Sequence, residues 1–296
     1  MPTTAPRHRR ALLIMLASAA FFVANVLLVR ALGTLGSANV WLIAVARFVV
    51  GLAMIVAVYR REFQPTHLWR NRKLIDRGVV GGIGVYLTYL TVVKLGAGRA
   101  TFIGNTYIIW GAFLAAWWLK EKLRPATLTG GAAALVGLAL LTNVFSSANP
   151  PGLYDALAVV ASLMSAHVVV TIRQLHDSEH TSTIFAAQCV YGLLICTVPA
   201  VATFEPLTPL AWGVLLVASV CAGAGQLTMT RAFRDLPVAE GSLIQILVPL
   251  GIACGGAAFF HEHFAPHELI GAALILAGCA FTALRRDAKP TPPENE

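Results

Sequence analysis

The stretch that decides the fold is residues 99–142, RATFIGNTYIIWGAFLAAWWLKEKLRPATLTGGAAALVGLALLT. It contains two long apolar segments joined by a short charged hinge, Lys120 to Pro125. The same pattern returns 141 residues later in the chain. The residues that coincide at this offset include Glu121 with Glu262, Pro125 with Pro266, Gly130 with Gly271 and Gly137 with Gly278. A repeat of this length predicts two copies of one helical unit.

Composition indicates an integral membrane protein. Hydrophobic residues make up 57% of the 296 and charged residues only 12%, whereas soluble domains carry about 25% charged residues. A helix needs roughly 20 apolar residues to cross a bilayer. Such runs are found at 11–31, 40–59, 78–95, 100–119, 126–144, 153–172, 183–203, 209–230, 238–260 and 267–284. We therefore expect an all-α membrane protein with ten transmembrane helices, five in each copy.

Five helices per copy require the second copy to run through the membrane upside down. The expected divisions are a cytoplasmic N-terminus (1–10), a first repeat (11–145), a second repeat (152–285) and a disordered cytoplasmic tail (286–296). The first hinge is rich in Lys and Arg, whereas its counterpart at 261–265 has neither. Inverted repeats are typical of secondary transporters, whose substrates bind where the two copies meet.

The net charge of +8 is explained by topology. Nearly all Lys and Arg fall at the ends of the predicted helices that share a side with the N-terminus. The positive-inside rule then places both termini in the cytoplasm, so the partners expected are the lipid bilayer and a small molecule, and no nucleic acid. The five cysteines lie inside predicted helices without a C-x-x-C pair, and no G-x-x-x-x-G-K-[ST] loop occurs. These patterns predict no metal site, no cofactor and no ATP-driven transport.

These residues resemble one family. Ten helices in two fives, Arg47 in the second helix, and the repeated pattern E-x3-P-x4-G-x6-G are similar to the EamA branch of the drug/metabolite transporter superfamily, including its amino acid exporters of the YddG type. The resemblance covers roughly residues 11–284. It implies a multi-pass carrier of the bacterial inner membrane that exports amino acids or other small metabolites. One departure concerns coupling, because small multidrug members carry a Glu in the first helix, whereas this chain has Asn25 there.

Arg47 is the costliest residue within a predicted helix. Its repeat equivalent is Gln188. A guanidinium can bind a carboxylate with two parallel hydrogen bonds, which would make Arg47 an anion site for substrate. The alternative is a structural arginine bonded to neighbouring helix ends and carbonyl groups. An arginine shared by transporters of unlike substrates favours the structural interpretation.

Polar and aromatic residues cluster in equivalent parts of the fourth and ninth predicted helices. The fourth contributes Asn105, Tyr107 and Trp110, and the ninth contributes Ser242 and Gln245. If the copies meet along these helices, such groups would line a substrate cavity suited to a zwitterion. The other interpretation is hydrogen bonding between helices, which is worth only about 0.6 kcal/mol on average in membranes.

Other polar residues in the predicted helices are weaker candidates. Those that could extend the cavity are Asn25, Tyr86, Tyr89, His167 and Gln226. Glu240 lies close to a helix N-terminus, where it could either stabilise the helix dipole or couple transport to protons. His167 is expected to be neutral and hydrogen-bonded, although it could also carry protons.

The sequence therefore predicts a secondary transporter that exports small metabolites, amino acids above all, by alternating access through a central cavity. Efflux of amphipathic or cationic drugs is the first alternative. An integral membrane enzyme is the second, but no convergent nucleophile or metal set is found at one membrane face, so we expect no enzyme. The oligomeric state stays open, with a monomer among the options.

Overall fold

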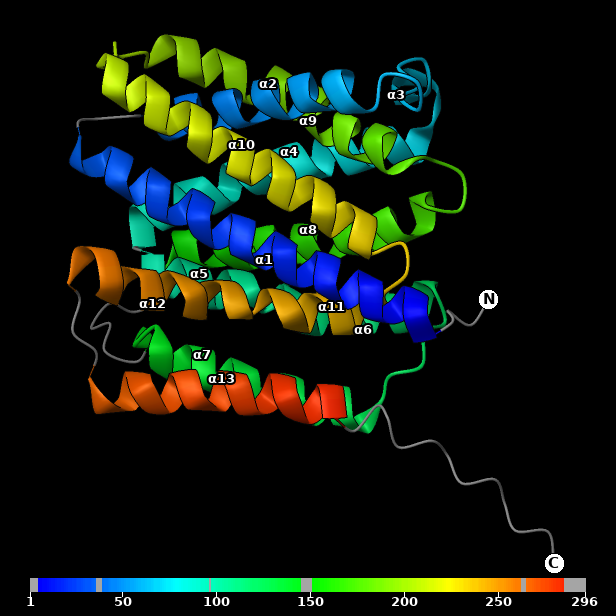
Figure 1. Ribbon diagram of the computed structural model, residues 1–296, viewed down its shortest axis with the longest axis vertical. Coiled ribbons are helices and arrows are strands. Elements are labelled where there is room, and N and C mark those ends of the chain that lie inside the picture. The colour runs from blue at the N-terminus through cyan, green and yellow to red at the C-terminus, as the bar shows by residue number, and fades with distance from the viewer. Residues whose placement is uncertain (1–4, 36–38, 96, 145–150, 262–264, 285–296) are drawn as a thin grey trace, which may run out of the picture.

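The computed structural model describes residues 5–35, 39–95, 97–144, 151–261 and 265–284, and all of its regular structure in those ranges is helical (Figure 1). The first part of the chain forms α1 (Ala5–Thr34), α2 (Val40–Val58), α3 (His67–Arg70), α4 (Arg72–Leu95), α5 (Ala97–Asn105), α6 (Tyr107–Trp118) and α7 (Pro125–Leu141). The second part forms α8 (Leu153–Leu175), α9 (Thr181–Ala202), α10 (Pro209–Ala232), α11 (Val238–Gln245), α12 (Leu247–Phe260) and α13 (Pro266–Leu284). The predicted tail, 286–296, and residues 262–264 of the second hinge lie outside the described residues.

The prediction of an all-helical membrane protein is confirmed. Six helical runs are long and apolar enough to cross a bilayer, within the part of the chain that the structure describes. They are Pro6–Gly33, Val40–Val58, Leu153–Leu175, Thr181–Ala202, Pro209–Ala232 and Val238–Phe260. Two shorter apolar helices, Pro125–Leu141 and Pro266–Thr282, accompany them. The chain is a multi-pass membrane protein.

Two of the expected helices are divided. The run predicted at 100–119 forms α5 and α6, which meet at Thr106, and the run predicted at 238–260 forms α11 and α12, which meet at Ile246. The Thr106 hydroxyl donates to the Ile103 carbonyl at 2.6 Å, a side-chain bond that often bends a helix. At the second break Pro249 has no N–H to donate, so the backbone ladder loses a bond there. The sequence analysis did not anticipate these divisions.

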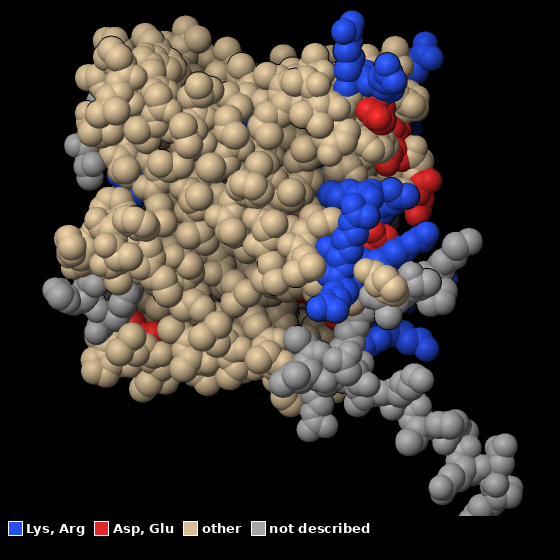
Figure 2. All heavy atoms as spheres, in the orientation of Figure 1, with Lys and Arg blue, Asp and Glu red and all other residues tan. Residues whose placement is uncertain are grey.

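Charge and hydrophobicity separate clearly on the molecular surface. Lys and Arg gather at one end of the molecule, the right-hand end in Figure 2, where α1 begins and α13 ends (Figure 1). Large apolar side chains are exposed on the flanks, among them Trp117 at 74%, Val198 at 73% and Phe259 at 74%. Exposed apolar surface of this extent requires a nonpolar surrounding. The uncharged belt in Figure 2 is therefore the surface that contacts lipid.

Helices from the two parts of the chain pair with one another. The extensive contacts join α1 to α10, α4 to α8, α2 to α9 and α7 to α13. In addition, α6 packs against α11. The core therefore forms between the two parts of the chain and not within each of them.

Glycines allow α7 and α13 to approach closely. A Cβ atom added to Gly137 would lie 2.5 Å from the Gly271 carbonyl oxygen, and one added to Gly271 would lie 2.5 Å from the Gly137 carbonyl oxygen. Gly130 and Gly278 face each other in the same reciprocal way. Because residue numbers fall along one helix as they rise along the other, the two helices run antiparallel. Small residues at such a contact are a common basis of helix association in membranes.

This contact predicts a position-specific effect on stability. Gly271→Ala forces a methyl group against a backbone carbonyl that cannot move aside, so we expect a loss of about 1–3 kcal/mol. Gly131→Ala is the matched control, because nothing lies within 4 Å of its added Cβ. The measurement is the thermal midpoint of each purified variant. Equal midpoints for the two variants would contradict the close approach of α7 and α13.

Candidate functional site

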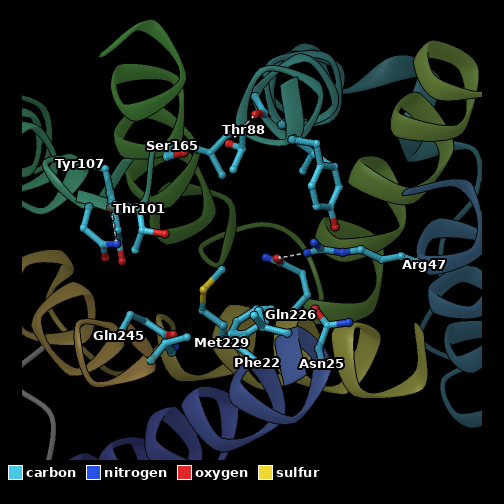
Figure 3. A pocket seen from close by; sticks show the side chains of 18 of the residues that line it. Phe22, Asn25, Arg47, Thr88, Thr101, Tyr107, Ser165, Gln226, Met229 and Gln245 are labelled. Carbon is cyan, nitrogen blue, oxygen red and sulfur yellow. Dashed lines mark hydrogen bonds between the residues drawn. The ribbon is translucent and has the colours of Figure 1, made fainter. Parts of the chain in front are cut away.

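A cavity of about 620 Å³ lies between the two parts of the chain. Its walls come from α1, α2, α4, α5 and α6 on one side and from α8, α9, α10, α11 and α12 on the other. Figure 3 shows Asn25, Arg47 and Gln226 at one end and Thr101, Tyr107 and Gln245 toward the other. Much of the remaining wall is aliphatic, including Val26, Val29 and Ile43. The cavity therefore combines an apolar wall with a few polar groups, as small-molecule sites usually do.

The structure brings seven of the twelve residues singled out from the sequence to this cavity. They are Asn25, Arg47, Tyr89, Asn105, Tyr107, Gln226 and Gln245. Their spread over seven helices means that no single segment forms the site. Packing of the two parts of the chain is what assembles it.

The amide side chains in the cavity wall also hold helices in place. Asn25 Nδ2 donates to the Ala218 carbonyl at 2.8 Å, and Gln245 Nε2 donates to Ser18 Oγ at 3.1 Å. Both bonds join α1 to a helix of the second part of the chain. Asn105 Nδ2 instead bonds within its own helix, to the Thr101 carbonyl at 2.8 Å. The two interpretations of these residues, cavity lining and bonding between helices, thus apply together to Asn25 and Gln245.

Five of the singled-out residues do not line the cavity. Trp110 is 39% exposed on the outer surface, and Ser242 is fully buried between helices. Tyr86 stacks on Trp41 with ring centroids 4.4 Å apart. The other two form polar pairs, His167 Nε2 with Asp76 Oδ2 at 2.6 Å and Glu240 Oε2 with His8 Nε2 at 3.8 Å.

Two arginines stand beside the cavity. Arg47, in α2, lines it and donates from Nη2 to Gln226 Oε1 at 3.1 Å (Figure 3). Arg77, in α4, is completely buried and donates from Nη2 to Gln188 Oε1 at 2.9 Å. Both glutamine partners line the cavity. Sequence reasoning missed Arg77 because it assigned this residue to the basic inner loop.

A local signal for Arg77 was present in the sequence. Gly81 lies four residues further along the chain, one helical turn away on the same face. A glycine in that position leaves room for the long side chain of Arg77 to lie along the helix. The other polar cavity residues that the sequence analysis did not name as site residues are Thr88, Thr101, Ser165 and Gln188.

Hydrogen bonds centred on Arg173 link several helix ends at the charged end of the molecule. Arg173 Nε donates to Glu121 Oε1 at 2.8 Å, and its Nη1 donates to the carbonyls of Phe233 and Arg234. The other oxygen of Glu121 accepts from the Val238 N–H at 3.0 Å. This network ties α8, the hinge before α7 and the connection from α10 to α11 to one another.

His176 completes this end of the molecule just after α8. Its Nε2–H donates to the Thr230 carbonyl at 2.7 Å. Burial, together with the neighbouring Arg234, Arg231 and Arg173, lowers its pKa to about 4. The imidazole is therefore neutral near pH 7 and acts here as a hydrogen-bond donor.

Comparison with known proteins gives a consistent picture. The model of the EamA-like transporter family matches twice, at residues 9–143 and 152–284. The pseudopaline exporter CntI of Pseudomonas aeruginosa, strains UCBPP-PA14 and PAO1, is 25% identical over 286 residues, which are 94% of this chain and 96% of that protein. A solved crystal structure of a protein matches with a TM-score of 0.79 and 17% identity, over 93% of this chain and 98% of its own. The family matches confirm the resemblance read from the sequence: the chain belongs to the EamA-like transporter family and is a transporter of the drug/metabolite transporter superfamily.

Proposed function

We propose that this protein is a secondary transporter that exports small metabolites, amino acids and their derivatives among them, by alternating access through the central cavity. The observation that carries the proposal is the cavity itself, which both parts of the chain line. Its volume of about 620 Å³ suits a small metabolite, and its arginine, amide and hydroxyl groups can orient polar substituents. The network around Arg173 links helix ends at the charged end of the molecule.

The proposal includes ten transmembrane helices in two inverted repeats, 11–145 and 152–285. The paired contacts support it, because an offset of 141 exchanges Gly130 with Gly271 and Gly137 with Gly278. The contact between Gly137 and Gly271 is then the counterpart of the contact between Gly278 and Gly130. The packing of α1 on α10 has the same relation to that of α8 on α4. Two halves related in this way can rock around a central site.

We propose that the charged end faces the cytoplasm of a bacterial cell, with the protein in the inner membrane. Support comes from the gathering of Lys and Arg at the end where α1 begins and α13 ends (Figures 1 and 2), because cytoplasmic loops carry an excess of these residues. Both termini then lie in the cytoplasm. The network around Arg173 lies at the same end.

The direction and class of substrate rest on further observations. The similar CntI proteins are named as exporters, which favours outward transport. The positive charge of Arg47 in the cavity wall disfavours cationic drugs, the principal alternative. Amino acids and their derivatives carry a carboxylate that this charge can attract, so they are the class we propose.

Reporter fusions test the orientation. Fusions placed after Arg124 and His180 should report a cytoplasmic position, and fusions after Asn39 and Thr203 an external one. The reason is that each successive helix crosses to the other side of the membrane, so α7 and α9 both begin in the cytoplasm and end outside. A consistent cytoplasmic signal after Thr203 would contradict the inverted arrangement.

Export itself is tested by metabolite profiling. Cells that overproduce the protein should release one or more small metabolites at a higher rate than cells with an empty vector. Thr88→Trp should abolish this difference, because the indole would occupy the cavity that Thr88 lines. Leu194→Trp is the matched control, since Leu194 is 62% exposed on the outer face of α9.

Membrane levels of both variants should be measured in the same cells. Release that persists unchanged in Thr88→Trp at equal membrane levels would contradict transport through this cavity. Identical profiles for the wild type and the empty vector, across cultures fed with amino acids and dipeptides, would contradict the export of this class of compound.

A further inference from the structure

Arg77 is a buried cation with most of its hydrogen-bonding capacity unused. Its side chain has no solvent exposure, and one nitrogen, Nη2, is bonded to Gln188. Its Nε and Nη1 atoms have no hydrogen-bond partner in the described part of the chain. An unpaired buried donor is unfavourable, and more so when it is charged. The burial of Arg77 is therefore unfavourable in free energy for a residue that would serve only to stabilise the fold.

The unused donors lie directly behind the cavity wall. Nη1 of Arg77 occupies the position where a side chain on Gly81 would begin. Gly81 lines the cavity, and so does Gln188, which holds Nη2. Because Gly81 has no side chain, the guanidinium of Arg77 packs directly against the backbone of a residue that lines the cavity.

Arg47 provides a second cation in the same region. Its Nη2 bonds to Gln226, as Figure 3 shows, and its Nε has no partner. The charges of Arg47 and Arg77 repel each other. Among the described residues neither arginine forms an ion pair, and the carboxylate of Asp76 bonds to His167 instead. The two guanidinium groups therefore keep N–H donors from which a carboxylate can accept hydrogen bonds.

We propose that Arg47 and Arg77 together bind the carboxylate of the transported compound, so that the substrates are organic anions with an apolar body. A guanidinium presents parallel N–H groups that match the two oxygens of a carboxylate. The rest of the compound then lies along the aliphatic wall formed by Val26, Val29 and Ile43. This inference rests on the proposed function and names the substrate class of the same cavity.

The site can be tested by binding, without knowing the natural substrate. The probes are N-benzoylglycine and N-benzoyl-L-glutamate, each compared with its neutral amide, and phenyl phosphate as a different anion. The readout is the thermal midpoint of the purified full-length protein in lipid nanodiscs at constant ionic strength. We expect a saturable rise with the carboxylates and none with the amides.

Variants locate the response. Arg47→Met and Arg77→Met should each weaken the carboxylate response at least tenfold in concentration, whereas Arg70→Met should leave it unchanged, because Arg70 is exposed at the end of α3. Without a ligand, Arg77→Met should melt no lower than the wild type, since it removes an uncompensated buried charge. Should Arg77→Met fail to fold, Arg77→Lys replaces it, because it keeps the charge but loses the paired donors.

The outcomes separate the site from the transport function. A wild type that responds to no carboxylate more than to its amide, or that responds to phenyl phosphate alone, overturns the inference. Equal responses in the wild type and both arginine variants overturn it as well. Export of only neutral or cationic compounds would refute the carboxylate site and leave transport standing. Carboxylate binding without any export would refute transport and leave the site standing.

Discussion

The constraint on which this structure depends is the free-energy cost of placing charged side chains where water cannot hydrate them. Moving an ion out of water costs several kcal/mol even after the protein relaxes, yet Arg47 lies in α2 and Arg77 in α4, both of which pack against α9. Each is held by one bond to a glutamine oxygen, at 3.1 and 2.9 Å. The glutamines in turn face the cavity. An anion bound in the cavity offsets the free-energy cost of burying the two arginines. The presence of the cavity therefore explains the presence of the arginines.

Close packing between other helices offsets the free-energy cost of burying these arginines. The reciprocal glycine contacts of α7 with α13 bring two backbones together with no side chain between them. Helix association in a bilayer relies on such packing, since lipid supplies no hydrophobic driving force between helices. The rigid edge formed by α7 and α13 leaves the remaining helices to form the cavity, and side-chain amides such as Asn25 fasten them to one another.

The sequence predicted the all-helical architecture because apolar runs long enough to cross a bilayer are easily recognised. It did not predict the divisions at Thr106 and Ile246 or the short helix α3. It predicted the cavity only in part. Asn105 ends α5 and lines the cavity, whereas Trp110 lies beyond the break at Thr106, on α6, where it is exposed on the outer surface. Arg77 was missed because its burial comes from α9, a segment more than 100 residues away, where Gln188 receives its hydrogen bond. Contacts of this kind depend on tertiary packing, and the spacing of Gly81 from Arg77 does not by itself reveal them.

A carboxylate substrate would also bear on how export is driven. An anion leaving a cell with a negative interior gains about 2.3 kcal/mol per charge for each 100 mV, so this export would need no acidic coupling residue in α1, which holds Asn25 instead. The most direct test is the electrical current of proteoliposomes on a supported membrane after a jump in N-benzoyl-L-glutamate. The account predicts that negative charge moves with the compound in the wild type and that no current flows in the Arg47→Met, Arg77→Met double variant. A current of opposite sign, or an equal current in the double variant, would contradict it.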